Sequence, residues 1–362
     1  MSEKYDLYSM DPEELVELFV GLGEPKFRAK QVFPRLHEGV PISEMTNLSK
    51  ALRATLADIT LDTLPRVEEK LVSRIDGTVK YLFKLHDGEC IESVFMRYKH
   101  GNTLCISSQV GCLMGCKFCA STLGGKVRDL RPSELLGQII AANRDTGERV
   151  SNIVMMGIGE PLDNFDNVIK FLKLVNHSDG LNIGYRHISL STCGVVPGIF
   201  KLAEVDLPIT LSISLHASND EKRTAIMPVN KKWCIAELLD ACVKYYERTG
   251  RRISFEYTLL EGKNDTEMDA RELAGLLKSA FRGTGAPIHV NLIRVNEVKE
   301  TEFKQGTADS ANNFARLLES LGVVATVRRR LGSDINAACG QLRRANSEGV
   351  RMGKKKESES KT

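Results

Sequence analysis

The chain contains a short loop with three cysteines, Cys112, Cys116 and Cys119, in the pattern C-x3-C-x2-C. Three thiolates in one loop can ligate three irons of a cubane iron–sulfur cluster, which leaves the fourth iron open to a small molecule. A structural zinc site is the alternative, but it requires four Cys or His ligands. No second C-x2-C or H-x3-H pair follows the loop, so the spacing favours the cluster.

The composition indicates a globular protein without membrane spans or a disulfide scaffold. Hydrophobic residues make up 42% of the 362 residues, and the longest apolar runs are far too short to cross a bilayer. The N-terminus lacks the apolar stretch of a secretory signal, and nine cysteines in a chain of this length indicate a reducing compartment. We therefore expect a cytoplasmic protein. The net charge of +3 does not by itself predict a nucleic-acid-binding protein.

Strand and helix patterns alternate after residue 101 and predict an α/β fold with a parallel sheet. Six strand–helix units are too few for a closed barrel of eight, so we expect a partial (β/α)6 barrel. A last strand is expected at 323–327. The six strands are expected at 103–107, 152–157, 187–191, 209–215, 253–259 and 289–295, with helices at 133–144, 164–175, 235–248, 267–281 and 309–321.

Three smaller segments flank this barrel core, which we place at 101–342. Residues 1–75 are expected to form a helical accessory domain, in which Asp11 and Pro12 have the residue types of a helix start. Residues 76–100 are expected to form a connecting strand pair, at 79–85 and 91–96. The tail at 343–362 is rich in Lys, Glu and Ser, and we expect it to be disordered.

Basic residues in the accessory domain lie beside aromatic ones on an expected helix. Lys26, Arg28 and Lys30 alternate with Phe27 near its start. They can contact RNA phosphates, or they can form a solvated face over a small core.

Polar residues follow the C-terminal ends of several expected strands, which is where barrels of this class gather functional groups. The cysteine loop follows the first strand, and a Gly-Ile-Gly-Glu-Pro run at 157–161 follows the second. Such a run can also be only a tight turn. Ser191, Ser214 and His216 end the third and fourth strands, where they are either core polar residues bonded to backbone or ligands of a bound molecule.

Two further cysteines differ from ordinary core residues. Cys105 lies on the first expected strand, and Cys339 lies between Gly332 and the tail in a segment too polar for a core. We interpret the others as small buried hydrophobes. These are Cys90, Cys193, Cys234 and Cys242.

Together these residues resemble one family, the radical S-adenosylmethionine (SAM) RNA methyltransferases that methylate carbon 2 of adenine in 23S ribosomal RNA and in transfer RNA. The resemblance extends over nearly the whole chain. It is carried by the segments at 23–31 (GEPKFRAKQ), 105–112 (CISSQVGC), 159–164 (GEPLDN), 190–194 (LSTCG), 214–217 (SLHA), 226–230 (IMPVN), 289–293 (HVNLI) and 338–341 (ACGQ).

The resemblance implies a radical SAM barrel that binds a [4Fe-4S] cluster and two SAM molecules per turnover. In the family, the three loop cysteines ligate the cluster, and the carboxylate at the position of Glu160 meets the SAM amino group. The other positions that match SAM contacts are Pro161, Ser191, Ser214, Leu215, His216 and Asn296.

The resemblance also implies roles for both unusual cysteines. In the family, the first SAM methylates a C-terminal cysteine, here Cys339, and the radical from the second SAM abstracts hydrogen from that methyl group. The carbon radical adds to adenine, and a carboxylate at the position of Glu92 accepts the ring proton. Cys105 then releases the product by forming a transient disulfide with Cys339. The alternative for Glu92 is a strand residue that faces solvent.

The implied partners are 23S ribosomal RNA, transfer RNA and a low-potential electron donor of the flavodoxin or ferredoxin type. No membrane is implied, and we expect a monomer. The basic runs at 328–330 and 354–356 are candidate phosphate contacts.

Three alternatives stay open. A sister group methylates adenine carbon 8 and shares all the cysteines. A radical SAM enzyme for a small molecule or peptide would not explain Cys339, and a non-catalytic, metal-stabilised RNA-binding protein would need no radical chemistry. One departure from the family lies at 291–297 (NLIRVNE), where the family often has proline after the Asn-Leu-Ile run.

Overall fold

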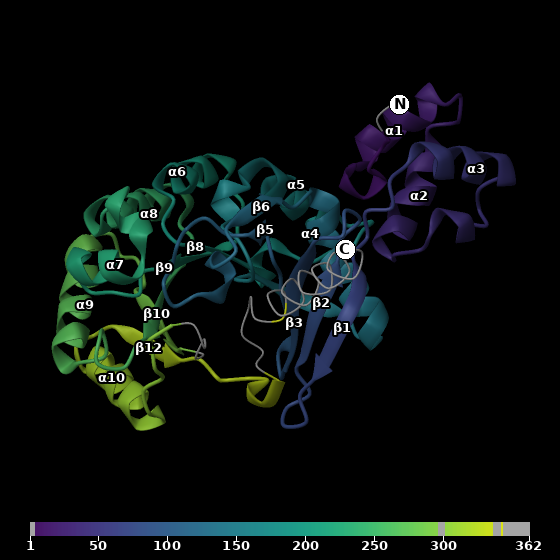
Figure 1. Cartoon of the computed structure of the whole chain (residues 1–362). Coiled ribbons are helices and arrows are strands. Elements are labelled where there is room, and N and C mark those ends of the chain that lie inside the picture. Colours follow the sequence, from purple (N-terminus) through teal and green to yellow (C-terminus); the bar gives the residue numbers. More distant parts are fainter. Residues whose placement is uncertain (1–3, 296–300, 336–341, 343–362) are drawn as a thin grey trace, which may run out of the picture.

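A single ten-stranded sheet forms the frame of the protein, in the order β1-β2-β3-β4-β7-β8-β9-β10-β11-β12. The computed structural model describes residues 4–295, 301–335 and 342 of the chain. The sheet curves into a barrel that is open on one side, and a helical lobe lies beside its N-terminal strands (Figure 1).

Parallel pairing runs from β4 to β12 and confirms the prediction of a partial barrel. Each expected strand is present within a few residues of its expected bounds. Their apolar side chains form one continuous core with the helices on the outer face. The strands are β4 (Gly101–Cys105), β7 (Val150–Met155), β8 (Ile188–Thr192), β9 (Thr210–Ser214), β10 (Ile253–Leu259), β11 (His289–Arg294) and β12 (Val324–Val327).

Helices cover the outer face of the barrel (Figure 1). The five expected ones are α4 (Pro132–Thr146), α5 (Phe165–Asn176), α8 (Ile235–Thr249), α9 (Glu267–Ala280) and α10 (Ala308–Ser320). Two shorter helices, α6 (Val196–Val205) and α7 (Asp220–Ile226), were not predicted. Within the described residues, no helix is long and apolar enough to cross a membrane.

Three antiparallel strands extend the barrel sheet at one edge. These are β1 (Arg66–Val72), β2 (Val79–Lys84) and β3 (Cys90–Tyr98). The last two are the expected strand pair, whereas β1 lies in the segment 1–75, for which only helices were expected. The sequence of β1 is RVEEKLV and its residues are nearly all exposed, so it lacks the alternation of a half-buried strand.

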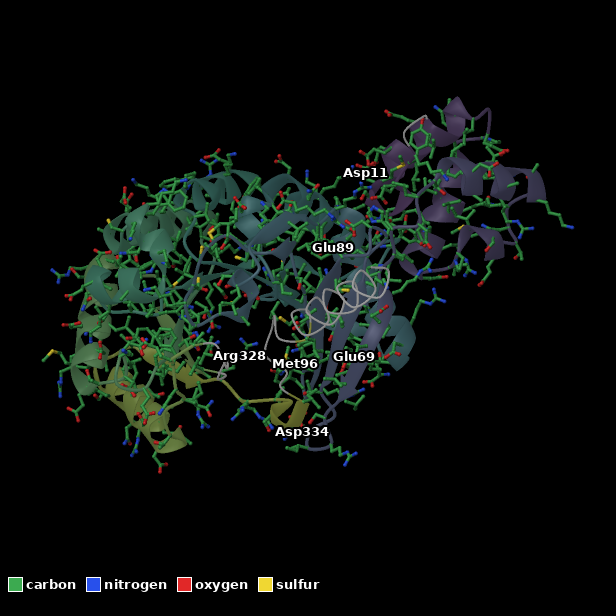
Figure 2. All side chains as sticks on the ribbon, in the orientation of Figure 1. Asp11, Glu69, Glu89, Met96, Arg328 and Asp334 are labelled. Atoms are coloured by element: carbon green, nitrogen blue, oxygen red, sulfur yellow. The ribbon has the colours of Figure 1, made fainter. Side chains whose placement is uncertain are left out.

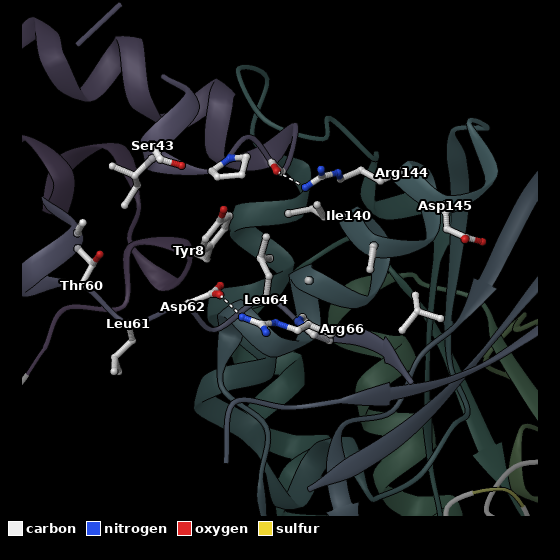
Figure 3. A pocket seen from close by; sticks show the side chains of 18 residues that line it. Tyr8, Ser43, Thr60, Leu61, Asp62, Leu64, Arg66, Ile140, Arg144 and Asp145 are labelled. Carbon is white, nitrogen blue, oxygen red and sulfur yellow. Dashed lines mark hydrogen bonds and ion pairs between the residues drawn. The ribbon is translucent and has the colours of Figure 1, made fainter. Parts of the chain in front are cut away.

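The N-terminal lobe contains α1 (Pro12–Gly21), α2 (Phe27–His37) and α3 (Lys50–Ile59), as the sequence predicts. Asp11 starts α1 by accepting a hydrogen bond from the Glu14 backbone N–H, and the Glu14 carboxylate accepts one from the Asp11 N–H. A cavity of about 690 Å³ lies between this lobe and α4, lined by Tyr8, Leu64 and Ile140 among others (Figure 3).

The segment after β12 returns to the turn between β1 and β2 (Figures 1 and 2). The Asp334 carboxylate accepts hydrogen bonds from the Ser73 hydroxyl at 2.7 Å and from the Arg74 backbone N–H at 2.8 Å. The Gly332 N–H donates to the Asp76 carboxylate at 2.8 Å. These bonds fix the chain on the first strands shortly before residue 336.

Two helical glycines give a matched test of the packing between α4 and the chain before β1. A Cβ on Gly137 would lie 2.3 Å from Pro65 Cδ, whereas a Cβ on Gly275 in α9 would meet nothing within 4 Å. We expect Gly137→Ala to lower the free energy of unfolding by about 1–3 kcal/mol, because the proline ring cannot yield. Gly275→Ala should instead raise it by up to about 1 kcal/mol through helix propensity. Urea unfolding of both variants measures this, and equal effects would contradict the packing.

Candidate active site

The cysteine loop connects the two strands of a small hairpin that follows the C-terminal end of β4. The hairpin consists of β5 (Gln109–Gly111) and β6 (Lys126–Asp129). The Cys112 N–H donates to the Gly125 carbonyl at 3.0 Å, and the Lys117 N–H donates to the Ile226 carbonyl at 2.9 Å. Gly111 has a φ of 81°, and a Cβ there would lie 1.9 Å from the Gly125 oxygen. Only glycine therefore fits before Cys112.

The three loop cysteines line one cavity of about 230 Å³ together with residues at the ends of several parallel strands. Of the expected SAM contacts, Glu160, Ser191, Ser214 and His216 are in this lining. The structure thus brings together residues that are more than 100 positions apart in the sequence.

The donor set fits an iron–sulfur cluster. Burial raises the pKa of the Cys112 thiol to about 11, and it also raises the pKa of Cys116, in both cases with a smaller contribution from Cys119. A thiol in such a pocket keeps its proton unless a metal cation binds the sulfur in place of that proton. Within the described residues, no three Cys, His, Asp or Glu side chains converge as a single metal ion requires. A cubane does not need that convergence, because each thiolate binds a different iron.

Glu160 is buried at the edge of the cavity with its carboxylate held by backbone. The Cys193 N–H donates to Oε2 at 2.7 Å and the Leu162 N–H donates to Oε1 at 3.0 Å. Burial raises the pKa of this carboxyl, and the two N–H donors act in the opposite direction. Pro161 follows it in a short 3-10 helix, Pro161–Asp163. A carboxylate has more acceptor positions than these two bonds use, so Glu160 can also receive an ammonium group.

The remaining expected SAM contacts differ in the chemical groups that they place at the cavity. The Ser191 and Ser214 hydroxyls are 3.5 Å apart across β8 and β9. His216 has a φ of 57°, and its Nδ1 accepts a hydrogen bond from the Thr258 N–H at 2.9 Å. Burial lowers the pKa of His216 to about 3, so its ring is neutral. Leu215 points into the main core instead, and only its backbone lies at the strand end.

Cys105 and Glu92 do not line this cavity, although Cys105 packs near one of its residues. Cys105 is a buried residue that lies opposite Val94 across β3 and β4 and packs near Met156, a cavity residue. Glu92 is fully buried and forms an ion pair with the fully buried Lys80, with Nζ and Oε2 3.1 Å apart. The alternative that Glu92 faces solvent is therefore wrong.

Two predicted site residues, Cys339 and Asn296, lie outside the described residues, as do the lysines at 354–356. Among the described arginines, Arg328 lines the cavity and its Nη1 is 3.4 Å from the Met156 sulfur.

Sequence reasoning missed several residues that build the site. The Gln109 amide oxygen accepts a hydrogen bond from the Glu160 N–H at 2.9 Å, and its amide nitrogen donates to Asp129 and Asp163. Glu256, buried on β10, lines the cavity and accepts a hydrogen bond from Asn291 at 2.7 Å. Cys193, interpreted as a core cysteine, also lines the cavity. Gln109 lies in the segment 105–112 and Cys193 in the segment 190–194, and their place in these two segments was the available signal.

Comparison with known proteins decides the family. The profile of the radical SAM superfamily matches residues 106–274, and that of the ribosomal RNA large subunit methyltransferase N-terminal domain matches residues 5–61. A relative from Alkaliphilus oremlandii, named "Probable dual-specificity RNA methyltransferase RlmN", is 55% identical over 94% of this chain and 98% of its own. The chain belongs to the radical SAM RNA methyltransferase family.

Other relatives agree with this membership. A protein with the same name from Lachnoclostridium phytofermentans is 52% identical over 95% of this chain and 96% of its own. A crystal structure of a radical SAM methyltransferase from Sphaerobacter thermophilus has a TM-score of 0.87 and 40% identity, and covers 93% of this chain and 98% of that one. The predicted family and enzyme class are thus confirmed, and membership implies a [4Fe-4S] cluster and SAM as cofactors.

Alanine substitutions test the cluster ligands. Replacing Cys112, Cys116 or Cys119 by alanine should each abolish the iron–sulfur absorbance of anaerobically purified protein, because each removes one of the few ligands available. Cys242→Ala is the control, since this buried thiol belongs to the core around α8. It should keep the absorbance and lose about 1 kcal/mol of stability. A full cluster in a loop variant would remove that cysteine from the ligand set.

Proposed function

We propose that this enzyme methylates carbon 2 of adenine in 23S ribosomal RNA and in transfer RNA. The observation that carries the proposal is the near full-length similarity to relatives named dual-specificity RNA methyltransferase. The cavity supports it, because it combines the cysteine loop with Glu160 at the ends of parallel strands.

In this proposal, the cavity residues bind and orient the cofactors. When bound, the cluster and SAM supply a 5′-deoxyadenosyl radical. Cys112, Cys116 and Cys119 ligate the cluster, and Glu160 receives the SAM ammonium group. Burial raises the pKa of Glu160, so a cation bound beside it would stabilise the charged carboxylate. Ser191, Ser214, His216 and the backbone around Pro161, Leu215 and Asn296 contribute the remaining contacts.

Three residues are proposed to transfer the methyl carbon, with two SAM molecules used per turnover. Cys339 carries the methyl group, and Glu92 accepts the proton from adenine. The Cys105 thiolate then attacks the Cys339 sulfur and forms a transient disulfide. The bond from that sulfur to the transferred carbon breaks, and the carbon takes up a proton to become the methyl group on adenine. The placement of Cys105 and Glu92 on adjacent strands beside the cavity supports this assignment. The buried ammonium of Lys80, 3.1 Å from Glu92, can stabilise the ionised carboxylate before it takes the proton.

RNA is proposed to contact the N-terminal lobe and the basic run at 328–330. Lys26 and Lys30 are exposed near the start of α2, whereas Arg28 is partly buried and paired with Glu24 at 3.1 Å. The two lysines are thus the better phosphate contacts. The target base must leave its stack to reach the cavity, at a cost of a few kcal/mol.

The division of the chain into 1–75, 76–100, 101–342 and 343–362 also remains a proposal, as do a monomeric state, a cytoplasmic location and a low-potential flavodoxin or ferredoxin as electron donor.

Mass spectrometry of nucleosides tests the function directly. Ribosomal and transfer RNA from cells that lack the gene should lose 2-methyladenosine, and the wild-type gene should restore it. Restoration by the Cys339→Ala variant would contradict the proposed carrier. Appearance of 8-methyladenosine instead would assign the chain to the carbon-8 group, and no change in either nucleoside would refute RNA methylation at both carbons.

The two proposed catalytic cysteines should fail at different steps. The Cys105→Ala variant can still methylate Cys339 and add the methyl carbon to adenine. It cannot release the product from Cys339, so protein covalently joined to RNA should accumulate. Cys339→Ala has no carrier and should form no adduct. A nuclease-sensitive shift on a denaturing gel reports the adduct. If both cysteines served only packing, each variant would lose about 1 kcal/mol of stability and neither would trap RNA.

A further inference from the structure

Arg223 on α7 is a buried cation whose hydrogen bonds all end on neutral oxygens. Its side chain is fully buried. Nε donates to the Leu215 carbonyl at 3.1 Å, Nη1 donates to Asn230 Oδ1 at 2.9 Å, and Nη2 donates to the carbonyls of Cys193 at 2.6 Å and Ser214 at 3.3 Å. The guanidinium thus joins the ends of β8 and β9 to the segment after α7.

The charge of Arg223 has no carboxylate partner among the described ion pairs. Two other buried charges do have a partner of opposite sign: Lys80 pairs with Glu92, and the buried Asp269 pairs with Lys222. Burial lowers the pKa of the Arg223 guanidinium. Asp220 raises it, but only by charge attraction without a hydrogen bond. Burying a cation without an anion is costly, so such a site indicates a missing negative charge.

The proposed cluster site is adjacent to this cation. Cys193 and Ser214, whose carbonyls Arg223 holds, line the same cavity as Cys116 and the other loop cysteines. The cysteine loop is also tied to the end of α7 by the bond from the Lys117 N–H to the Ile226 carbonyl, 2.9 Å long.

We propose that Arg223 is the internal counter-charge of the iron–sulfur cluster and raises its reduction potential. Three thiolates outweigh the positive charge of an oxidised cubane core, and reduction adds one more negative charge. A fixed positive charge behind the cavity therefore stabilises the reduced cluster more than the oxidised one. The arginine remains charged across the physiological pH range.

Arg223 is also a positioning residue, because it fixes Cys193. The Cys193 N–H donates to Glu160 Oε2, and the Cys193 carbonyl accepts from Arg223. Loss of the side chain would disturb this arrangement as well as the charge. The test must therefore separate a change of charge from a loss of hydrogen bonds.

Redox titration of the reconstituted holoenzyme, followed by electron paramagnetic resonance, makes this separation. In Arg223→Gln, the ratio of reduced to oxidised cluster at a fixed potential should fall about tenfold, which is about 59 mV for a one-electron couple. Arg223→Lys retains a charge and should stay within about threefold of wild type. Asn230→Ala removes one hydrogen-bond partner of Arg223 without a change of charge, and its potential should match wild type although its melting temperature falls.

Equal potentials in wild type and Arg223→Gln would overturn the proposal, and so would an equal shift in Arg223→Lys and Arg223→Gln. If the glutamine variant fails to fold, Arg223→Met supplies a neutral side chain that suits a buried site, with the same expected fall. The inference rests on the proposed cluster. A wild-type protein that binds no iron and sulfide would refute the cluster itself, whereas a loaded wild type with an unshifted neutral variant would refute only the role of Arg223.

Discussion

Parallel pairing from β4 to β11 is the constraint on which the candidate site depends. Because these strands run in one direction, the segments that follow them emerge at the same edge of the sheet. The register then decides which side chains meet: Ser191 lies opposite Ser212, and Ser214 lies opposite Glu256. A shift of one residue would turn these polar groups into the outer core and leave the cavity without ligands.

The charged groups around the cavity fall into two kinds. Lys80 and Glu92 are both buried and form an ion pair, so the pair carries no net charge. Glu160 and Arg223 are also buried, but each is bonded to neutral groups, and Cys193 lies between them. The carboxylate of Glu160 can therefore interact with a cationic sulfonium substrate and its ammonium group. The guanidinium of Arg223 can interact with an anionic cluster. The buried charges of the site are thus complementary to two cofactors of opposite charge.

Periodicity in the sequence located most elements of the barrel, because long apolar strands and amphipathic helices have strong patterns. It failed for β1, whose charged residues are typical of an exposed edge, and for α6 and α7, which are short. The cysteine loop and the Gly-Glu-Pro run were recognised because their chemistry depends on spacing within a few residues.

The sequence by itself determined the partial barrel, the three cysteines of the loop and the resemblance to a family of RNA methyltransferases, since each depends on local pattern. Only the tertiary structure decided that Glu92 is buried against Lys80 and that the Gln109 amide accepts a hydrogen bond from the Glu160 N–H. It also decided that Glu256 lines the cavity and that Arg223 bonds the carbonyl of the cavity residue Cys193. A side chain's partner across strands depends on register and on the chain's path through space. Periodicity gives the face on which a residue lies, but it does not give the residue that it meets there.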